Sequence, residues 1–362
     1  MSLTQAVRVT LYFVLLSGFC LFPFASPRLR QFIYLQDEKS WDDARNACQE
    51  KEASVATLYD YEDVKLVKNL SESIRSIWLG LRRTRPEITT WSDSAPYTFS
   101  NSTKRDHDEW QWCEAIEKGT WKAYKCSEKL DFMCSAGNTH RVIEGGKKNW
   151  CQAQQYCRTH YSDLASIRNE TENQRVIETG GNKTFWIGLM HDRWQWENGT
   201  CSTYRNWKDQ KGNCSILFFG STVMQQQDCR NDENILCSKG TVRIIAVNES
   251  YTWERALDYC EKNHTGLLWI RDEHDRDAVA QHLNFTDVPG PFWIGLRQSP
   301  LFGFWIWKDR VVTYSNWKDG KTPEPPMSQL CAVIKNENTW TDENCFLKHH
   351  FLCEEEVSFN PT

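Results

Sequence analysis

The sequence predicts an α+β fold that is repeated three times and held together by disulfides. Three features predict it: a helix pattern that ends in a cysteine, a short apolar strand motif with a glycine, and a late group of cysteines. Each feature recurs three times, in the same order, along 362 residues. A chain of this length can bury several cores, so three domains of about 100 residues each are expected.

The first element of each repeat is an amphipathic helix. A tryptophan stands seven residues before a cysteine and an alanine four before it, and a helix brings these positions onto one face. A second helical stretch follows in the repeats, for example at 60–69 and 169–178. The three copies of the first pattern are WDDARNAC at 41–48, WCQAQQYC at 150–157 and WERALDYC at 253–260.

A buried strand follows about 30 residues after each of these cysteines. It reads WLGL at 78–81, and WIGL at 186–189 and 293–296. A short apolar run with one glycine is typical of a buried strand that another backbone approaches closely. The motifs lie 108 and 107 residues apart, which is the length of a domain and too long for a solenoid unit. The rest of each repeat predicts strands and loops, which makes the unit α+β.

The amino-terminal segment predicts export from the cytoplasm. Arg8 precedes the apolar run 9–22, and small residues follow, which is the order of a signal peptide over residues 1–26. The run is short for a membrane span, so an uncleaved anchor is the alternative. No later segment is long and apolar enough to span a bilayer, and a secreted, extracellular protein is therefore expected.

Cysteines and glycosylation sequons agree with an oxidising compartment. Cys20 lies in the expected signal peptide, which leaves 14 of the 15 cysteines, and an even number favours disulfides. A ninth sequon, at Asn213, is the least favourable because its middle residue is Cys214. The eight asparagines expected to carry glycans are Asn69, Asn101, Asn169, Asn182, Asn198, Asn248, Asn263 and Asn284.

The helix with its cysteine, the WxGL strand and the late cysteines resemble the C-type lectin-like domain, in three copies at 27–135, 138–238 and 241–354. The tandem arrangement resembles the macrophage mannose receptor type of protein, on a shorter scale. The resemblance implies two helices and antiparallel strands per domain, with the first cysteine bonded to the last and the middle two bonded together. The implied disulfides are Cys48–Cys134, Cys113–Cys126, Cys157–Cys237, Cys214–Cys229, Cys260–Cys353 and Cys331–Cys345.

Two cysteines of the second repeat, Cys151 and Cys201, lie outside this pattern. The simplest expectation is a bond between them. Cys151 lies about 100° away from the buried face of its helix, so its side chain can reach a neighbouring loop. Two free thiols or an intermolecular bridge are the alternatives.

Lectins of this family hold a sugar through calcium, which prefers six to eight oxygen ligands. The resemblance places the ligands in a Glu-Pro-Asn or Gln-Pro-Asp tripeptide, in an acid two residues before the third cysteine, and in Asn-Asp after a tryptophan. The first repeat lacks the tripeptide and has Gln111, Lys122 and Ala123 at the other positions. The second has Gly212, and MQQQ in place of the tryptophan motif. Neither repeat keeps the necessary oxygens.

The third repeat keeps part of such a site. Glu324 and Pro325 match the start of the tripeptide, but Pro326 removes the side-chain oxygen of its third residue. Gln329 replaces the acid, and Asp342 keeps one carboxylate. The resemblance therefore implies a degenerate calcium site made of Glu324, Gln329 and Asp342. No cofactor is expected, with calcium in the third repeat as the alternative.

The expected function is non-enzymatic extracellular recognition of a protein or glycan ligand, without calcium. The net charge of −5 argues against nucleic acid as a partner. No HExxH, GxSxG or phosphate-loop motif suggests an enzyme. Tryptophans within 108–112, 191–199 and 301–307 could supply contacts, although strand alternation in each W-x-W pair favours the inner face. Calcium-dependent carbohydrate binding through the third repeat is the alternative function.

Overall fold

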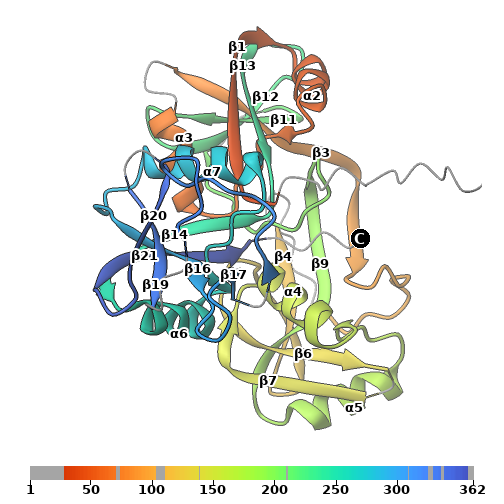
Figure 1. The fold of residues 1–362 in the computed structure, drawn as a ribbon. Coiled ribbons are helices and arrows are strands. Elements are labelled where there is room, and N and C mark those ends of the chain that lie inside the picture. The colour runs from red at the N-terminus through yellow and green to blue at the C-terminus, as the bar shows by residue number, and fades with distance from the viewer. Residues whose placement is uncertain are drawn as a thin grey trace, which may run out of the picture.

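The chain folds into three lobes, each with two helices and antiparallel strands (Figure 1). This confirms the predicted α+β class. The expected signal peptide, with Cys20, lies outside the described residues. The computed structural model describes residues 28–70, 74–102, 111–137, 139–208, 211–308, 310–324, 329–335 and 338–357.

The third lobe, residues 240–357, is built from a single repeat. Strand β21 (His349–Glu356) pairs antiparallel with β14 (Val242–Tyr251) and in parallel with β16 (Phe292–Gln298). The tryptophan, alanine and cysteine of the helix pattern are its buried positions in α6, as predicted. The remaining elements are α6 (Trp253–Asn263), β15 (Gly266–Leu267), α7 (Glu273–Leu283), β17 (Trp305–Trp307), β18 (Arg310–Val311), β19 (Leu330–Ile334) and β20 (Trp340–Asn344).

The first lobe combines the amino-terminal half of the first repeat with the carboxyl-terminal half of the second. Strand β13 (Glu233–Lys239) pairs with β1 (Gln31–Lys39), β2 (Ser54–Val55) and β3 (Ser76–Trp91). Figure 1 shows this mixture as red and green strands side by side. The other elements of this lobe are α2 (Trp41–Gln49), α3 (Tyr61–Leu70), β10 (Trp207–Lys208), β11 (Cys214–Phe218) and β12 (Val223–Gln227).

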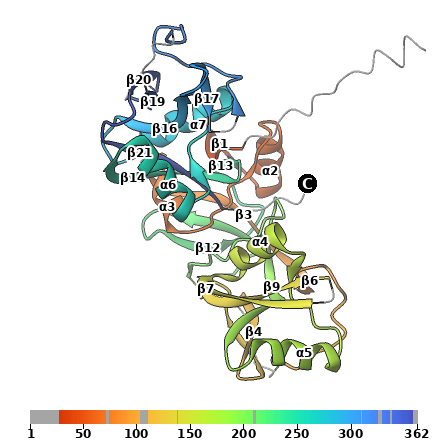
Figure 2. The same cartoon turned by 60° about the horizontal axis from the view of Figure 1, so that its bottom comes forward.

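The second lobe contains the two complementary halves, within residues 88–191. Strand β6 (Leu130–Ala136) pairs with β7 (Thr139–Lys148), β8 (Asp163–Leu164) and β9 (Thr184–Trp196). Figure 2 shows this lobe at the opposite end of the molecule from β20 of the third lobe. Its other elements are β4 (Trp112–Glu117), β5 (Thr120–Lys125), α4 (Trp150–His160) and α5 (Glu170–Gly180).

The disulfides follow this exchange of halves. The structure contains Cys48–Cys237 and Cys134–Cys157, so the implied pairs Cys48–Cys134 and Cys157–Cys237 are wrong. The two repeats share one pattern, and the late half of either one therefore offers an equivalent strand and cysteine to either helix. The other implied bonds are present as expected: Cys113–Cys126, Cys214–Cys229, Cys260–Cys353 and Cys331–Cys345.

The length of one hinge segment explains the exchange. In the third repeat the chain turns back after β16 through Gly303, which has a φ of 75°, and Leu296 then pairs with Trp307. In the second repeat Leu189 and Trp196 are seven positions apart, and no glycine or proline lies between them. A hinge too short to turn back within its own domain favours exchange between domains.

In place of the missing turn, strands β3 and β9 pair with each other. They are 16 and 13 residues long and run antiparallel from one lobe into the other. Leu81 pairs with Trp196 in the first lobe, and Leu189 pairs with Trp91 in the second. Each lobe thus regains the Leu–Trp pair that the third lobe makes within one hairpin.

The glycine of the WxGL strand lies where two backbones meet. A Cβ added to Gly80 would lie 2.5 Å from the carbonyl oxygen of Val55, and one added to Gly295 would lie 3.0 Å from that of Leu268. The first contact is shorter than real Cβ atoms show, and the second would require the neighbouring backbone to shift by a few tenths of an ångström. The close approach predicted from the sequence is therefore confirmed.

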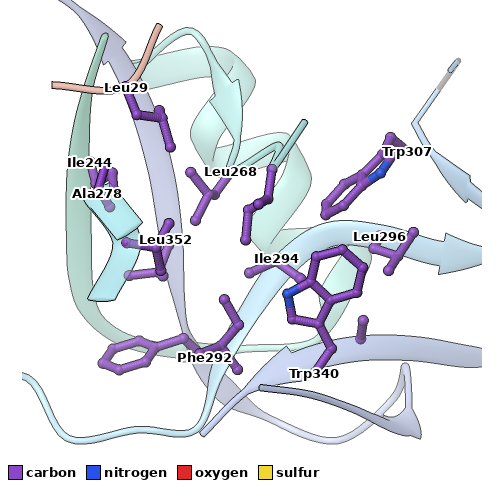
Figure 3. Close-up of a cluster of buried hydrophobic side chains, with 14 of the residues drawn as sticks. Leu29, Ile244, Leu268, Ala278, Phe292, Ile294, Leu296, Trp307, Trp340 and Leu352 are labelled. Atoms are coloured by element: carbon purple, nitrogen blue, oxygen red, sulfur yellow. The ribbon is translucent and has the colours of Figure 1, made fainter. Parts of the chain in front are cut away.

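Residues 28–30 join the first lobe to the third. Leu29 packs in the core of the third lobe, beside Ile244 and Leu352 in Figure 3. Arg30 pairs with Asp63 of the first lobe at 2.9 Å, and Arg243 of the third lobe reaches the same carboxylate at 3.0 Å. Burial opposes ionisation of Asp63, but the two guanidinium groups lower its pKa below the usual value.

Candidate functional site

The calcium positions of the first repeat carry other contacts in the second lobe. Lys122 forms an ion pair with Glu117. The Nε2 atom of Gln111 donates to Oδ2 of Asp192 at 3.0 Å. Ala123, at the remaining position, has no side-chain oxygen. These positions therefore present an ammonium group and an amide that is already hydrogen-bonded.

The corresponding position in the second repeat is closed by backbone. A Cβ added to Gly212 would lie 2.3 Å from the carbonyl oxygen of Gln227. Only a residue without a side chain fits there. An acidic ligand at this position would require the strand that contains Gln227 to move.

The candidate calcium residues of the third repeat are all exposed at the surface of the third lobe. They are Glu324, Gln329 and Asp342. Asp342 lies opposite Ala332 in the β19–β20 ladder, whereas Glu343 points to the other face and bonds to Lys335 at 3.0 Å. Two carboxylates and one amide are fewer oxygens than calcium prefers. The degenerate site stays a prediction, and Pro325 and Pro326 lie outside the described residues.

The W-x-W tryptophans pack inward. Trp194 and Trp196 are 6% and 2% exposed, while Gln195 between them is exposed. Trp305 and Trp307 are buried in the same way. The inner-face expectation from strand alternation is therefore confirmed for these pairs, and Trp110 lies outside the described residues. The exposed apolar side chains of the β16–β17 hairpin are instead Leu301, Phe302 and Phe304.

All nine sequon asparagines are described and exposed, which is compatible with glycosylation. Asn198 already makes the turn typical of such sites, because its Oδ1 atom accepts from the hydroxyl of Thr200 at 2.8 Å. Glycan attachment itself stays a prediction.

The structure joins Cys151 to Cys201, which is the simplest pairing expected from the sequence. Because the halves are exchanged, this bond links α4 of the second lobe to the segment that enters the first lobe. It therefore links two lobes covalently at their boundary, although both cysteines belong to one repeat.

A pocket of about 250 Å³ lies beside this disulfide, and we call it the seam pocket. Strand β9, helix α4 and the segment 199–205 form its walls. Val357, at the end of the third lobe, lines one side. The lining residues on which its chemistry depends are Gln111, Trp150, Gln155, Asp192, Trp196 and Arg205.

A buried ion pair forms part of the pocket wall. Arg205 donates to Oδ2 of Asp192 at 2.9 Å, and the two side chains are only 7% and 9% exposed. The other carboxylate oxygen accepts from the backbone N–H of Trp194 at 2.8 Å. Burial raises the pKa of the Asp192 carboxyl despite the neighbouring guanidinium. The Nε atom of Arg205 is buried without a hydrogen-bond partner.

All three repeats match one known domain family. The model of the lectin C-type domain matches residues 37–136, 146–239 and 249–355. The chain belongs to the C-type lectin domain family. Domains of this family serve non-enzymatic recognition, which agrees with the class of function expected from the sequence.

The similar proteins are receptors with several such domains. The chain is 23% identical to human C-type mannose receptor 2, over 94% of this chain and 30% of the receptor. It is also 23% identical to the bovine secretory phospholipase A2 receptor, over 90% of this chain and 28% of the receptor. The chain therefore spans less than a third of the length of these curated relatives.

Solved C-type lectin domains match one part of the chain at a time. The mouse scavenger receptor C-type lectin carbohydrate-recognition domain is 27% identical, with a TM-score of 0.28, and covers 32% of this chain and 91% of its own. Among the described residues of the lectin, no helix combines the length and apolar character that a membrane crossing requires.

The sequence did not reveal the seam pocket. Gln155 and Asp192 lie within stretches that the sequence analysis describes, but neither is one of the patterned positions, and Arg205 belongs to no motif. The available signal was the cysteine pair outside the family pattern, because a disulfide added to a complete framework marks a segment that must be held in place.

Proposed function

We propose that this lectin is a secreted, extracellular protein that recognises a protein or glycan ligand without calcium. The chemistry at two of the three calcium positions supports this. Lys122 places a paired ammonium group at one of them, and the backbone beside Gly212 leaves no room for a carboxylate at another. A site for a divalent cation needs several carboxylate oxygens, and neither position supplies them.

Calcium-dependent carbohydrate binding through the third repeat is a second candidate. The exposed carboxylates of Glu324 and Asp342 support it, because ligands for a sugar-binding calcium must face solvent. Only two carboxylates are present, and calcium affinity depends on their number. We therefore place this function second.

Binding of the full disulfide-bonded chain to glycan arrays and to cultured cells tests the proposal. We expect equal binding in calcium and in excess EDTA. Asp342→Ala should bind like the wild type, and so should Asp319→Ala, which removes another exposed acid of the same lobe. Binding that EDTA abolishes, and that only Asp342→Ala reduces, would establish the second candidate instead. Recovery of the processed chain from culture medium tests secretion, and retention on the cell surface would support an uncleaved anchor.

A further inference from the structure

A groove of about 340 Å³ lies between the first lobe and the third, and we call it the interlobe groove. Helix α3 of the first lobe forms one wall. Helix α7 of the third lobe forms the other, together with the segment 285–288 that follows it. Figure 1 shows the two helices side by side, and residues 243–246 of β14 also line the groove. Neither lobe forms this groove alone.

Each helix presents one regular face to the groove. Apart from the buried Asp63, the lining positions of α3 are spaced as i, i+3, i+4 and i+7, and the same spacing recurs in α7 and the turn after it. Residues at this spacing lie on one side of a helix. Asn69 is therefore on the face of α3 that borders the third lobe. The positions are Glu62, Lys65, Leu66 and Asn69 in the first lobe, and Ala278, Gln281, His282 and Phe285 in the third.

The two lobes are bonded to each other beside the groove. Arg243 of β14 pairs with Asp60 at 2.7 Å and with Asp63 at 3.0 Å. The side-chain amide of Gln281 in α7 donates to the carbonyl oxygen of Phe32 at 2.7 Å and accepts from its N–H at 3.0 Å. These contacts hold the walls at a fixed separation, so a group that enters the groove contacts both lobes.

One residue of the groove is also an expected site of covalent modification. Asn69 begins the sequon Asn-Leu-Ser at 69–71, and it is exposed. An N-glycan is joined to the amide nitrogen of an asparagine side chain, and it is too bulky and polar for a packed core. Because Asn69 lines the groove, this bond leads the first sugar into the space between the two lobes.

We propose that the N-glycan on Asn69 places its first N-acetylglucosamine in the interlobe groove and packs there against the third lobe. The volume of about 340 Å³ is at the lower end of the range for small-molecule sites, so the groove accommodates the first sugar while the outer sugars extend into solvent. The covalent bond gives this sugar a high effective concentration at the groove. Contacts too weak to hold a free sugar are therefore sufficient here.

The lining matches the chemistry of this sugar. N-acetylglucosamine has apolar C–H faces and an acetyl methyl group, and its hydroxyl and amide groups donate and accept hydrogen bonds. The apolar side chains of the lining come from both lobes and are Leu66, Phe285 and Val288. The exposed charged side chains also come from both lobes and are Glu62, Lys65 and Asp287. The sugar therefore has apolar and charged partners on both walls.

The inference needs export of the chain, which belongs to the proposed function, but it needs no ligand. Timed digestion of the full, folded chain with a peptide N-glycosidase tests it, and mass spectrometry follows each site as its asparagine becomes aspartate. Asn69 should lose its glycan roughly tenfold more slowly than Asn263, because the groove must open before the enzyme reaches the bond. Asn263 is the matched control, since it is exposed at the carboxyl end of α6 and does not line the groove. In the reduced, denatured chain the two rates should be equal.

Hydrogen exchange tests the contact with the third lobe. Asn69→Gln and Ser71→Ala both remove the glycan, and Ser71→Ala keeps the asparagine side chain. In both variants the backbone amides of 285–288 should exchange roughly fivefold faster than in the wild type, because the sugar no longer covers them. Asn263→Gln removes a glycan elsewhere and should leave that exchange unchanged.

A sugar packed between the lobes requires both slow release at Asn69 and faster exchange at 285–288 once the glycan is lost. The inference is overturned if Asn69 carries no glycan in the exported chain, or if Asn69 and Asn263 are released at equal rates. It is also overturned if exchange at 285–288 is the same with and without the glycan. Cell binding that requires calcium would count against the proposed function and would leave these results unaffected.

Discussion

The exchange of halves between the first two repeats predicts which fragments stay linked after the chain is cleaved at one position. A protease recognition sequence inserted after Gly137 lies in the β6–β7 turn, where exposed backbone tolerates insertion. In the processed chain expected from the sequence, cleavage there separates residues 27–137 from the rest. At 42.5 kDa for 362 residues, that fragment has a mass of about 13 kDa before glycosylation. Two disulfides, Cys48–Cys237 and Cys134–Cys157, cross the cut in the exchanged structure.

The assay is gel electrophoresis of the cleaved protein with and without reductant. We expect no released fragment without reductant, and complete release of the 27–137 fragment with it. A domain whose disulfides all stay within one repeat would release the fragment in both conditions. Release without reductant would therefore refute the exchange, and a tryptic map that joins Cys48 to Cys134 would refute it independently.

Three further predictions concern stability and metal binding. Replacing Cys151 and Cys201 together by serine should lower the free energy of unfolding by about 4 kcal/mol, from the entropy of a 50-residue loop; an unchanged guanidinium midpoint would contradict this. Burial and then Arg243 lower the pKa of His282 to about 4, so the unfolded chain binds the proton more readily. Stability should thus fall by up to about 3 kcal/mol from pH 6.5 to 4, and His282→Gln should flatten that dependence in urea titrations. In calorimetric titrations of calcium, the full wild-type chain and Asp342→Ala should give the same heat.

Local patterns in the sequence predicted the elements and their buried faces. A tryptophan, an alanine and a cysteine at helical spacing are the buried positions of α2, α4 and α6. Strand alternation placed Trp194 and Trp196 inside and left Gln195 exposed. These features depend on residues that are close in the sequence, so the local sequence is enough to predict them.

The partners of these elements could not be predicted in the same way. The first and second repeats carry interchangeable cysteines and strands, so the pattern is satisfied equally by Cys48–Cys134 and by Cys48–Cys237. The difference lies in the hinge between Leu189 and Trp196. Its length is informative only in comparison with the longer hinge of the third repeat, which can turn back. The seam pocket escaped prediction for the same reason, because Asp192 and Arg205 come together only after the exchange.

The disulfides of the exchanged pair also determine how the molecule bears tension. A pull on the two ends of the described chain passes through Cys48–Cys237 and Cys260–Cys353 and bypasses everything between each pair. Only the segments 28–48, 237–260 and 353–357 can then extend. Disulfides confined to each repeat would leave the connection between the first two repeats in the path of the force. The exchange removes that connection, and residues 48–237 of the first two repeats bear tension as one unit that does not extend.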